Sequence, residues 1–224
     1  MTTSGTSVFN LEIVDIIEEA YERAGLEART GYDYRTARRS LNILSAEWSN
    51  RGLNLWTVQE NSLVLTPGVK TYSLADDTID IIETMIRVST SGSPLDYSVS
   101  RIGVGDYAAL PNKNTTGRPL QIYVNRQVSP EFTLWPVPDL PYTLLYWTMR
   151  RIQDATTATD VMDMPVRFVP CLVAGLAFQI AMKRPEAAAR IPMLKQEYME
   201  QFQLAADEDR GREPARFVPW MPYS

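Results

Sequence analysis

The spacing of apolar residues changes twice along the chain. Up to Asn50, apolar residues recur every three or four positions, which is the period of an amphipathic helix. From Leu55 they alternate with polar residues, as is typical of strands with one buried face. The helical period returns near Met164. The pattern therefore predicts an α+β fold, with helices on both sides of a central antiparallel β-sheet or small sandwich.

A first helix is predicted between Asn10, a favourable N-cap residue, and Gly25. Its expected buried stripe comprises Leu11, Val14, Ile17, Tyr21 and Ala24. Acidic residues on its other faces are expected to meet water or a neighbouring molecule; they are Glu12, Asp15, Glu18, Glu19 and Glu22.

A second helix is predicted over residues 33–50, with Gly52 just after its end. Its expected buried face comprises Ala37, Leu41, Leu44 and Trp48. Its expected exposed face carries Arg35, Arg38 and Arg39. The two helices would form an antiparallel hairpin, and a hairpin with one apolar side needs a partner to bury that side.

The β region begins with a predicted hairpin, in which residues 55–65 return through the turn 66–69 into residues 71–74. Further strands are expected at 79–88, 95–99, 120–125, 132–135 and 142–151, each bounded by Pro, Gly, Asn or Asp. A short helix at 106–110 and a loop at 111–117 interrupt them.

Two C-terminal helices follow. The first is rich in Leu and Ala and tolerates Pro165 in its first turn. The second starts at Pro185, accommodates Pro192 and ends in acidic residues 207–209. With the N-terminal hairpin they are expected to form a helical bundle. The predicted division is 1–54 for the hairpin, 55–151 for the β domain, 152–210 for the C-terminal helices and 211–224 for an extended arm.

The predicted arm contains three prolines, which preclude a helix or a central strand. Phe217, Trp220 and Tyr223 recur every third residue, and aromatic side chains are frequent anchors of interfaces. We interpret the arm as a peptide that docks on a partner in an extended or polyproline conformation. The alternative is that it folds back over the chain's own sheet.

Composition narrows the possible chemistry. The chain has no histidine, which excludes Ser-His-Asp and Cys-His catalysis and His-ligated zinc. Cys171 is the single cysteine and cannot form an internal disulfide, so a reducing cytoplasm is the expected compartment of synthesis. No phosphate-binding glycine motif is present. We therefore predict a protein that is not an enzyme and has no catalytic residue, metal site or cofactor.

Charge and hydropathy argue against two classes of partner. The formal net charge is −5, which disfavours tight binding of nucleic acid. The longest strongly apolar stretch, residues 171–182, is short of the roughly 20 residues that span a bilayer, so it is interpreted as a core helix and no membrane partner is expected.

One enzymatic alternative stays open. Asp76, Asp77, Asp80 and Glu83 form the densest acidic patch and could supply a carboxylate pair for peptidoglycan hydrolysis. A solvated acidic turn explains the same residues more simply.

Several local strings, in this order, resemble the head-to-tail adaptor proteins of tailed bacteriophages, specifically the tail tubular protein A-like and packaged-DNA stabilisation group. The strings are Ala37-Arg38-Arg39-Ser40-Leu41-Asn42 with Trp48 and Arg51-Gly52, Gly117-Arg118-Pro119 with Ile122-Tyr123, Leu134-Trp135-Pro136-Val137-Pro138-Asp139, and Met164-Pro165.

The resemblance implies a virion protein that forms a ring, typically of twelve copies, between the portal protein and the tail. Such a ring seals the head and lets DNA pass through its channel without specific binding. The implied partners are the portal protein, a tail nozzle or tail tube protein, and other copies of the chain. The resemblance also implies that the arm inserts into the portal, through Arg212, Arg216, Phe217, Trp220 and Tyr223. Another virion assembly or tail-completion protein is the alternative.

Overall fold

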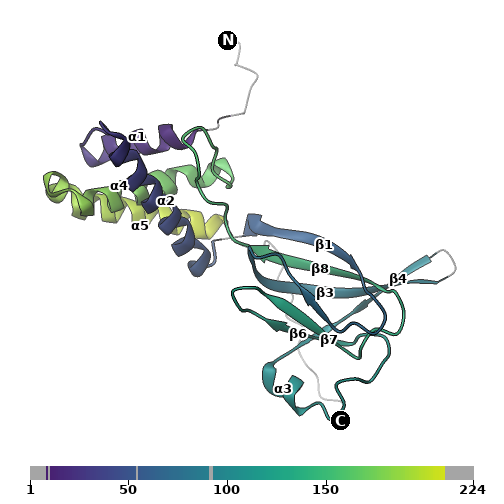
Figure 1. Ribbon diagram of the computed structural model, residues 1–224. Helices are drawn as coiled ribbons and strands as arrows, with labels where there is room; N and C mark the ends of the chain where they lie inside the picture. Colours follow the sequence, from purple (N-terminus) through teal and green to yellow (C-terminus); the bar gives the residue numbers. More distant parts are fainter. Residues whose placement is uncertain (1–8, 10, 54, 91–92, 210–224) are drawn as a thin grey trace, which may run out of the picture. The chain divides into compact units, whose positions relative to one another are not determined.

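The computed structural model describes residues 9, 11–53, 55–90 and 93–209, although not the side chains of residues 89 and 90. The chain divides into two compact units (Figure 1). The helical unit takes its residues from 1–55 and 154–224, and the β unit is Trp56–Gln153. Within the described residues there are five α-helices and two four-stranded sheets, so the predicted α+β class is confirmed.

The helical unit contains α1 (Ile13–Ala24), α2 (Gly31–Arg51), α4 (Val169–Lys183) and α5 (Ile191–Glu208). Two 3-10 segments, η2 (Val166–Phe168) and η3 (Pro185–Arg190), precede α4 and α5. Pro192 therefore lies in the first turn of α5, where its missing N–H costs no helical hydrogen bond. As predicted, Gly52 ends α2 in the left-handed conformation, with φ of 87°.

The start of α1 differs from the prediction. The helix begins at Ile13 with Glu12 at its N-cap, and Asn10 lies outside the described residues. The buried stripe consists of Ile13, Ile16, Ile17, Ala20, Tyr21 and Ala24. Leu11 and Val14, which were expected in the stripe, are only half-buried. A stripe centred on Ile13, Ile16 and Ile17 fits the period of the helix equally well, and contact with α4 selects it.

Helix α4 is the core of the helical unit. It packs against α1, α2 and α5, and α1 and α2 contact each other less than each contacts α4. Nine of its residues are buried: Cys171, Leu172, Val173, Ala174, Gly175, Leu176, Ala177, Ile180 and Ala181. Among the described residues, Val166–Lys183 is the segment long and apolar enough to cross a membrane by length and composition. Its burial by the other helices fits the core helix predicted at 171–182.

The β unit contains eight strands in two sheets, β1-β8-β3-β4 and β2-β7-β6-β5. Their bounds are β1 (Val58–Val64), β2 (Thr71–Ser73), β3 (Thr78–Thr90), β4 (Ser93–Ser98), β5 (Ser100–Ile102), β6 (Gln121–Asn125), β7 (Glu131–Trp135) and β8 (Thr143–Arg150). All pairings are antiparallel except β5 with β6. Helix α3 (Val104–Ala109) follows β5.

The predicted hairpin at 55–74 is wrong. Strand β1 pairs with β8, with Val64 opposite Thr143, and β2 pairs with β7 in the other sheet. The predicted turn instead carries the chain between the sheets, where the N–H of Gly68 donates to the carbonyl of Pro138 at 2.8 Å. Alternation of apolar residues tells which face of a strand is buried, but it does not identify the partner strand.

The core of the β unit lies between its two sheets. It consists of Leu65, Ile81, Ile86, Val99, Ile122, Val124, Phe132, Leu134 and Leu144. All of these residues except Leu65 and Val99, which lie next to strand ends, come from strands of the two sheets, so the unit is a small sandwich. Strand β4 is exposed along its whole length, because it extends the β3 hairpin beyond this core (Figure 1).

Candidate functional site

The predicted arm lies outside the described residues. This applies to all five of its proposed binding residues, Arg212, Arg216, Phe217, Trp220 and Tyr223. In the helical unit, polar groups come together at the α1–α2 connection, in the 154–161 segment, and on the outer faces of α1 and α2.

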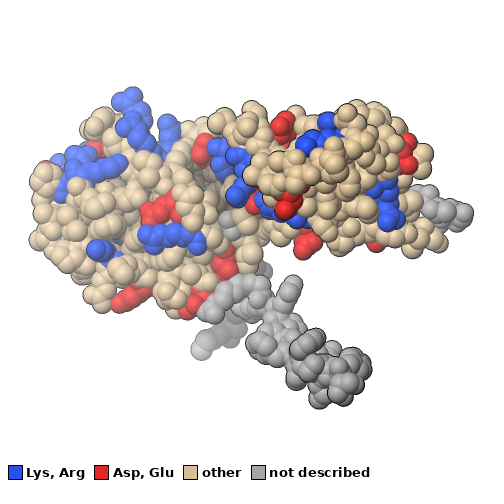
Figure 2. Space-filling model, turned by 90° about the horizontal axis from the view of Figure 1, so that it is seen from below, with Lys and Arg blue, Asp and Glu red and all other residues tan. Residues whose placement is uncertain are grey.

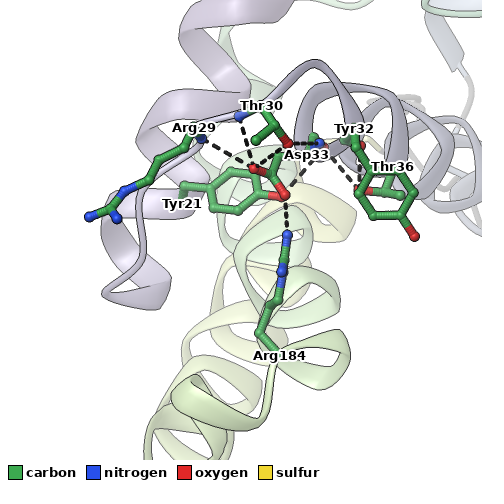
Figure 3. A network of polar contacts seen from close by, with 7 residues as sticks. All are labelled: Tyr21, Arg29, Thr30, Tyr32, Asp33, Thr36 and Arg184. Atoms are coloured by element: carbon green, nitrogen blue, oxygen red, sulfur yellow. Dashed lines mark hydrogen bonds and ion pairs between the residues drawn. The ribbon is translucent and has the colours of Figure 1, made fainter.

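The α1–α2 connection is organised around the carboxylate of Asp33 (Figure 3). Its Oδ2 accepts hydrogen bonds from the N–H of Arg29 at 3.2 Å, the N–H of Thr30 at 3.0 Å and the Thr30 hydroxyl at 2.9 Å. In return, Thr30 Oγ1 accepts from the N–H of Asp33 at 3.3 Å, which completes a capping box at the start of α2. The hydrogen bond from the Thr30 side chain is the main reason that the pKa of Asp33 lies below its ordinary value of 3.8.

Arg184 joins this cap to the end of α4. Its guanidinium donates to Asp33 Oδ1, and the hydroxyl of Tyr21 donates to the backbone carbonyl of Asp33 at 3.4 Å. Tyr21 and then Asp33 raise the pKa of the Arg184 guanidinium, so the pair stays charged. We call these residues (Tyr21, Thr30, Asp33 and Arg184) the Asp33 clamp. The clamp ties α1, α2 and α4 together, and every charge in it is already paired, so its role is to hold the helices in place.

A second polar cluster shapes the segment that returns from the β unit. The Asp160 carboxylate accepts from the N–H groups of Thr156 at 3.2 Å and Thr157 at 2.7 Å, and from both hydroxyls. These bonds, led by the one from the Thr156 side chain, hold the pKa of Asp160 well below its ordinary value. The turn is therefore fixed by a charged acceptor.

The fixed turn caps α1. The carbonyls of Asp160 and Ala158 accept from the N–H groups of Ile13 at 2.9 Å and Val14 at 3.0 Å, which otherwise have no partner within the helix. Asn42 of α2 holds the same segment, because its Oδ1 accepts from the N–H of Ala155 at 2.9 Å. One segment thus contacts both the start of α1 and the outer face of α2.

Comparison with models of known protein families identifies the family of this chain. The model of the SU10 adaptor protein family matches residues 11–220, which is nearly the whole chain. The chain belongs to the SU10 adaptor protein family. It is therefore a bacteriophage head-to-tail adaptor, a structural component of the virion that interacts with other head and tail components. Among curated proteins, no sequence matches the chain.

The resemblance found in the sequence is confirmed at the level of the adaptor. Its finer placement, in the tail tubular protein A-like and packaged-DNA stabilisation group, stays a prediction. SU10 adaptors are structural rather than enzymatic proteins.

In the acidic patch of the adaptor, the Asp80 carboxylate is paired with arginines, and the backbones of Asp76 and Asp77 bond to Arg151. Asp80 Oδ1 lies 2.8 Å from the guanidinium of Arg101, and Asp80 Oδ2 lies 3.3 Å from that of Arg126. The carbonyls of Asp76 and Asp77 accept from the side chain and the N–H of Arg151. Among the residues that the structure describes, no group of His, Cys, Asp and Glu could hold a metal ion. The solvated acidic turn is the interpretation that these contacts support.

The single cysteine of the adaptor is inside the helical unit. Cys171 is buried in α4, and burial raises the pKa of its thiol to about 12. Because the thiolate is the reactive form, this side chain behaves as a small apolar core residue.

Two outer surfaces of the helical unit carry opposite charges. Lys and Arg side chains gather along one rim of this unit, at the left of Figure 2. A basic face on α2, formed by Arg35, Arg38 and Arg39, borders a groove of about 620 Å³ with Ile43 and Asn42. An acidic groove of about 690 Å³ lies between α1 and the start of α4. The sequence pattern predicted both sets of exposed charges, although not the apolar residues that accompany them.

Proposed function

We propose that the adaptor forms a ring of twelve copies between the portal protein and the tail, where it seals the head and conducts DNA. The proposal is supported by the family match over residues 11–220 together with the resemblance in the sequence. A net charge of −5 suits a channel that DNA crosses without being held. The ring would assemble in the host cytoplasm, and a tail nozzle or tail tube protein would bind its other side.

The contact with the portal would be made by residues 211–224. At about 3.3 Å per extended residue, a segment of this length reaches about 45 Å, enough to cross onto another protein. Phe217, Trp220 and Tyr223 would fill apolar pockets of the portal, while Arg212 and Arg216 would pair with acidic groups around them. Because its prolines restrict the backbone, the segment loses less conformational entropy on binding than a flexible one.

The test is to mix the purified adaptor with the portal of the same phage and to image the product by electron microscopy. A ring of twelve copies on the portal is expected. An adaptor without residues 211–224 should not attach, and the triple variant Phe217→Ala, Trp220→Ala, Tyr223→Ala should lose most of its attachment.

The matched control changes two apolar residues of the same segment that are not aromatic, Val218→Ala and Met221→Ala. This variant should attach nearly as well as the natural chain. If the truncated adaptor attaches as well as the full chain, the assignment of the arm is wrong. If the full chain does not attach to the portal at all, the proposed position in the virion is wrong.

A further inference from the structure

The basic face of α2 has an exposed apolar residue among its arginines. Arg35, Arg39 and Ile43 are spaced four residues apart, so they lie in one row on the helix. Ile43 is 55% exposed, although α2 offers a buried face to α4 for apolar residues. We call Arg35, Arg38, Arg39 and Ile43 the basic ridge.

The charges of the basic ridge are poorly compensated within the described part of the chain. Arg38 donates to the carbonyl of Thr156, and no ion pair joins Arg35 or Arg39 to a described acidic side chain. Arginines one turn apart repel each other and weaken an isolated helix. Arg39 also lies close enough to Lys183 to add to the lowering of that lysine's pKa, which burial causes in the first place. An external partner with negative charge would relieve this repulsion.

The acidic groove carries charge of the opposite sign around its apolar residues. Its floor is apolar and includes Val169, Pro170 and Val173 of α4, with Val166 at 42% exposure beside them. The acidic residues of α1 that line it are Asp15, Glu18, Glu19 and Glu22. Arg23 lines it too, but it is bound to Glu19 and Glu197, each at 2.8 Å.

Three acidic residues therefore give the groove its charge. Glu18 accepts from the Tyr34 hydroxyl at 2.6 Å, and Asp15 accepts from the N–H of Glu12 at 3.2 Å. No ion pair joins either of them, or Glu22, to a described basic side chain. We call Asp15, Glu18, Glu22 and the apolar floor the acidic groove.

The two surfaces are complementary in charge, and each has apolar side chains among its charged ones; Asp154 also lines the groove beside the arginines, but no ion pair joins it to them. The ridge presents an apolar side chain surrounded by arginines, and the groove presents an apolar hollow bordered by carboxylates. They share no residue, so one copy can use both surfaces at once. A contact between two different surfaces of identical chains is heterologous, which is the type of contact that closes a ring.

We propose that the basic ridge of one copy docks in the acidic groove of the next copy, with Ile43 on the apolar floor and Arg35 and Arg39 facing Glu18 and Glu22. The proposal rests on the ring proposed above and names the contact that closes it. Arginine and carboxylate form directional pairs at such interfaces, and opposite patches also speed the encounter of the copies.

DNA is a less suitable partner for the ridge. A phosphate backbone would pair with the arginines but would leave Ile43 exposed, and it would not explain the acidic groove on the same unit. A ridge of three arginines also contrasts with the larger number of phosphate contacts in proteins that hold DNA firmly.

The test uses two charge-reversed adaptors on the portal of the same phage. The first carries Arg35→Glu and Arg39→Glu, and the second carries Glu18→Arg and Glu22→Arg. Each alone would bring like charges together in every contact of the ring. We expect at least about a tenfold loss of ring occupancy for either variant, because like charges facing each other in an interface are costly. Electron microscopy and mass photometry measure the occupancy.

A mixture of the two variants should restore the ring. The acidic ridge of the first then meets the basic groove of the second, and the basic ridge of the second meets the acidic groove of the first. A ring with an even number of copies closes with alternating variants. A chain that carries all four changes should also form rings. Lys195→Glu and Glu200→Arg, on exposed positions of α5, are the matched controls and should leave the ring unchanged.

The outcomes separate the two proposals. If the natural chain forms rings and both reversed variants do so equally well, the ridge and groove are not the contact, while the proposed function stands. If neither the mixture nor the fourfold variant restores rings, the proposal is also wrong. If the natural chain forms no ring on the portal, the proposed function itself fails. Retention of double-stranded DNA that is lost in the first variant, with rings unchanged, would make the ridge a DNA surface instead.

Neutral variants cover the case in which a reversed chain does not fold. Arg39→Gln and Glu22→Gln change exposed side chains without adding repulsion. Each should reduce ring occupancy, and the two together should reduce it little more than either alone, because both remove the same pairing. Effects of the two changes that simply add would contradict a direct contact.

Discussion

At the scale of single residues, Asp33 connects the sequence to the arrangement of the helical unit. Its side chain accepts from two N–H groups and one hydroxyl, and it also receives the Arg184 guanidinium. The prediction began the helix at position 33, whereas α2 begins two residues earlier, at Gly31, and Asp33 is the N3 residue of its capping box. The distant Arg184 could not be inferred, because nothing near it in the sequence indicates which carboxylate it will meet.

Asp33→Asn should destabilise the helical unit by about 1–2 kcal/mol at neutral pH, the scale of a lost helix cap. The effect should depend on pH. Because folding lowers the pKa of Asp33 below 3.8, its contribution is complete above that value and is lost as the pH falls through the folded-state pKa. Urea unfolding of the natural chain and of Asp33→Asn at pH 7, 5 and 3 tests this. The difference between their free energies of unfolding should narrow only at pH 3.

The control for Asp33 is Glu27→Gln, which breaks a nearby ion pair with Arg29 at 2.8 Å. Both side chains of that pair are more than 70% exposed, so the change should cost at most about 0.5 kcal/mol. A difference between Asp33→Asn and the natural chain that stays constant down to pH 3 would contradict the assigned role of the charge.

Tyr198 makes a buried hydrogen bond that no local pattern reveals. The indole N–H of Trp48 donates to the Tyr198 hydroxyl at 3.2 Å, and the two side chains are 0% and 6% exposed. Tyr198→Phe should cost about 1–3 kcal/mol, because the indole N–H would stay buried without a partner. Denaturant unfolding followed by tryptophan fluorescence measures the loss.

Tyr34→Phe makes the same chemical change at an exposed site, where the hydroxyl donates to Glu18 at 2.6 Å. Water can replace this bond, so a change within about 0.5 kcal/mol is expected. Equal costs for Tyr198→Phe and Tyr34→Phe would show that burial of the indole partner does not matter.

At the scale of elements, the close approach of three helices depends on Gly175 in α4. A Cβ atom there would lie 2.8 Å from Leu44 Cδ2 and 2.9 Å from Tyr198 Cε2. Leu44 is fully buried, and the Tyr198 ring is held by Trp48, so neither can move away freely. Gly175→Ala should therefore cost about 1–3 kcal/mol through overpacking, despite the better helix propensity of alanine.

Gly31→Ala is the matched control, because Gly31 opens α2 and a Cβ there meets nothing within 4 Å. It should be neutral or stabilising by up to about 1 kcal/mol. Thermal unfolding of both variants gives the comparison. A stabilising Gly175→Ala would mean that α2 and α5 can separate from α4 without loss.

The elements also show where prediction from the sequence ends. The first two helices were predicted within three residues, because period and caps are local properties. The last helix was predicted from Pro185, but residues 185–190 form a 3-10 segment and α5 begins at Ile191. The pairing of the strands was not predicted correctly, since the partners β1 and β8 are separated in sequence by most of the β unit. Strand β5 was missed because three residues pair through their backbone without an apolar pattern.

For the candidate surfaces, too, the local features could be predicted and the long-range ones could not. The exposed arginines of α2 and acids of α1 could be predicted, since charge at non-buried positions is visible in the period. The apolar floor of the acidic groove could not be predicted, because Val166 and Val169 lie beside α1 only in the folded unit. The proposed role of the arm comes from its composition and from the family resemblance, because its residues lie outside those that the structure describes.

At the scale of the whole molecule, the surfaces proposed for assembly all belong to one of the two units. The ridge, the groove and the chain leading to the arm belong to the helical unit, and the eight strands belong to the β unit. The β unit is a continuous segment with its own core, whereas the helical unit is assembled from both ends of the chain. The β unit is thus the part with the means to fold by itself.

We predict that the isolated segment Trp56–Gln153 folds cooperatively. Every strand pairing of both sheets lies within it, and domains of about 100 residues bury enough surface to be stable. Thermal unfolding by circular dichroism should show one transition, and Leu144→Ala should lower stability by about 2–5 kcal/mol because Leu144 is fully buried between the sheets. The exposed Leu95→Ala is the control and should change little. A segment without a cooperative transition would show that the sandwich depends on the helices.

The folded segment should not join rings, since the ridge, the groove and the arm are absent from it.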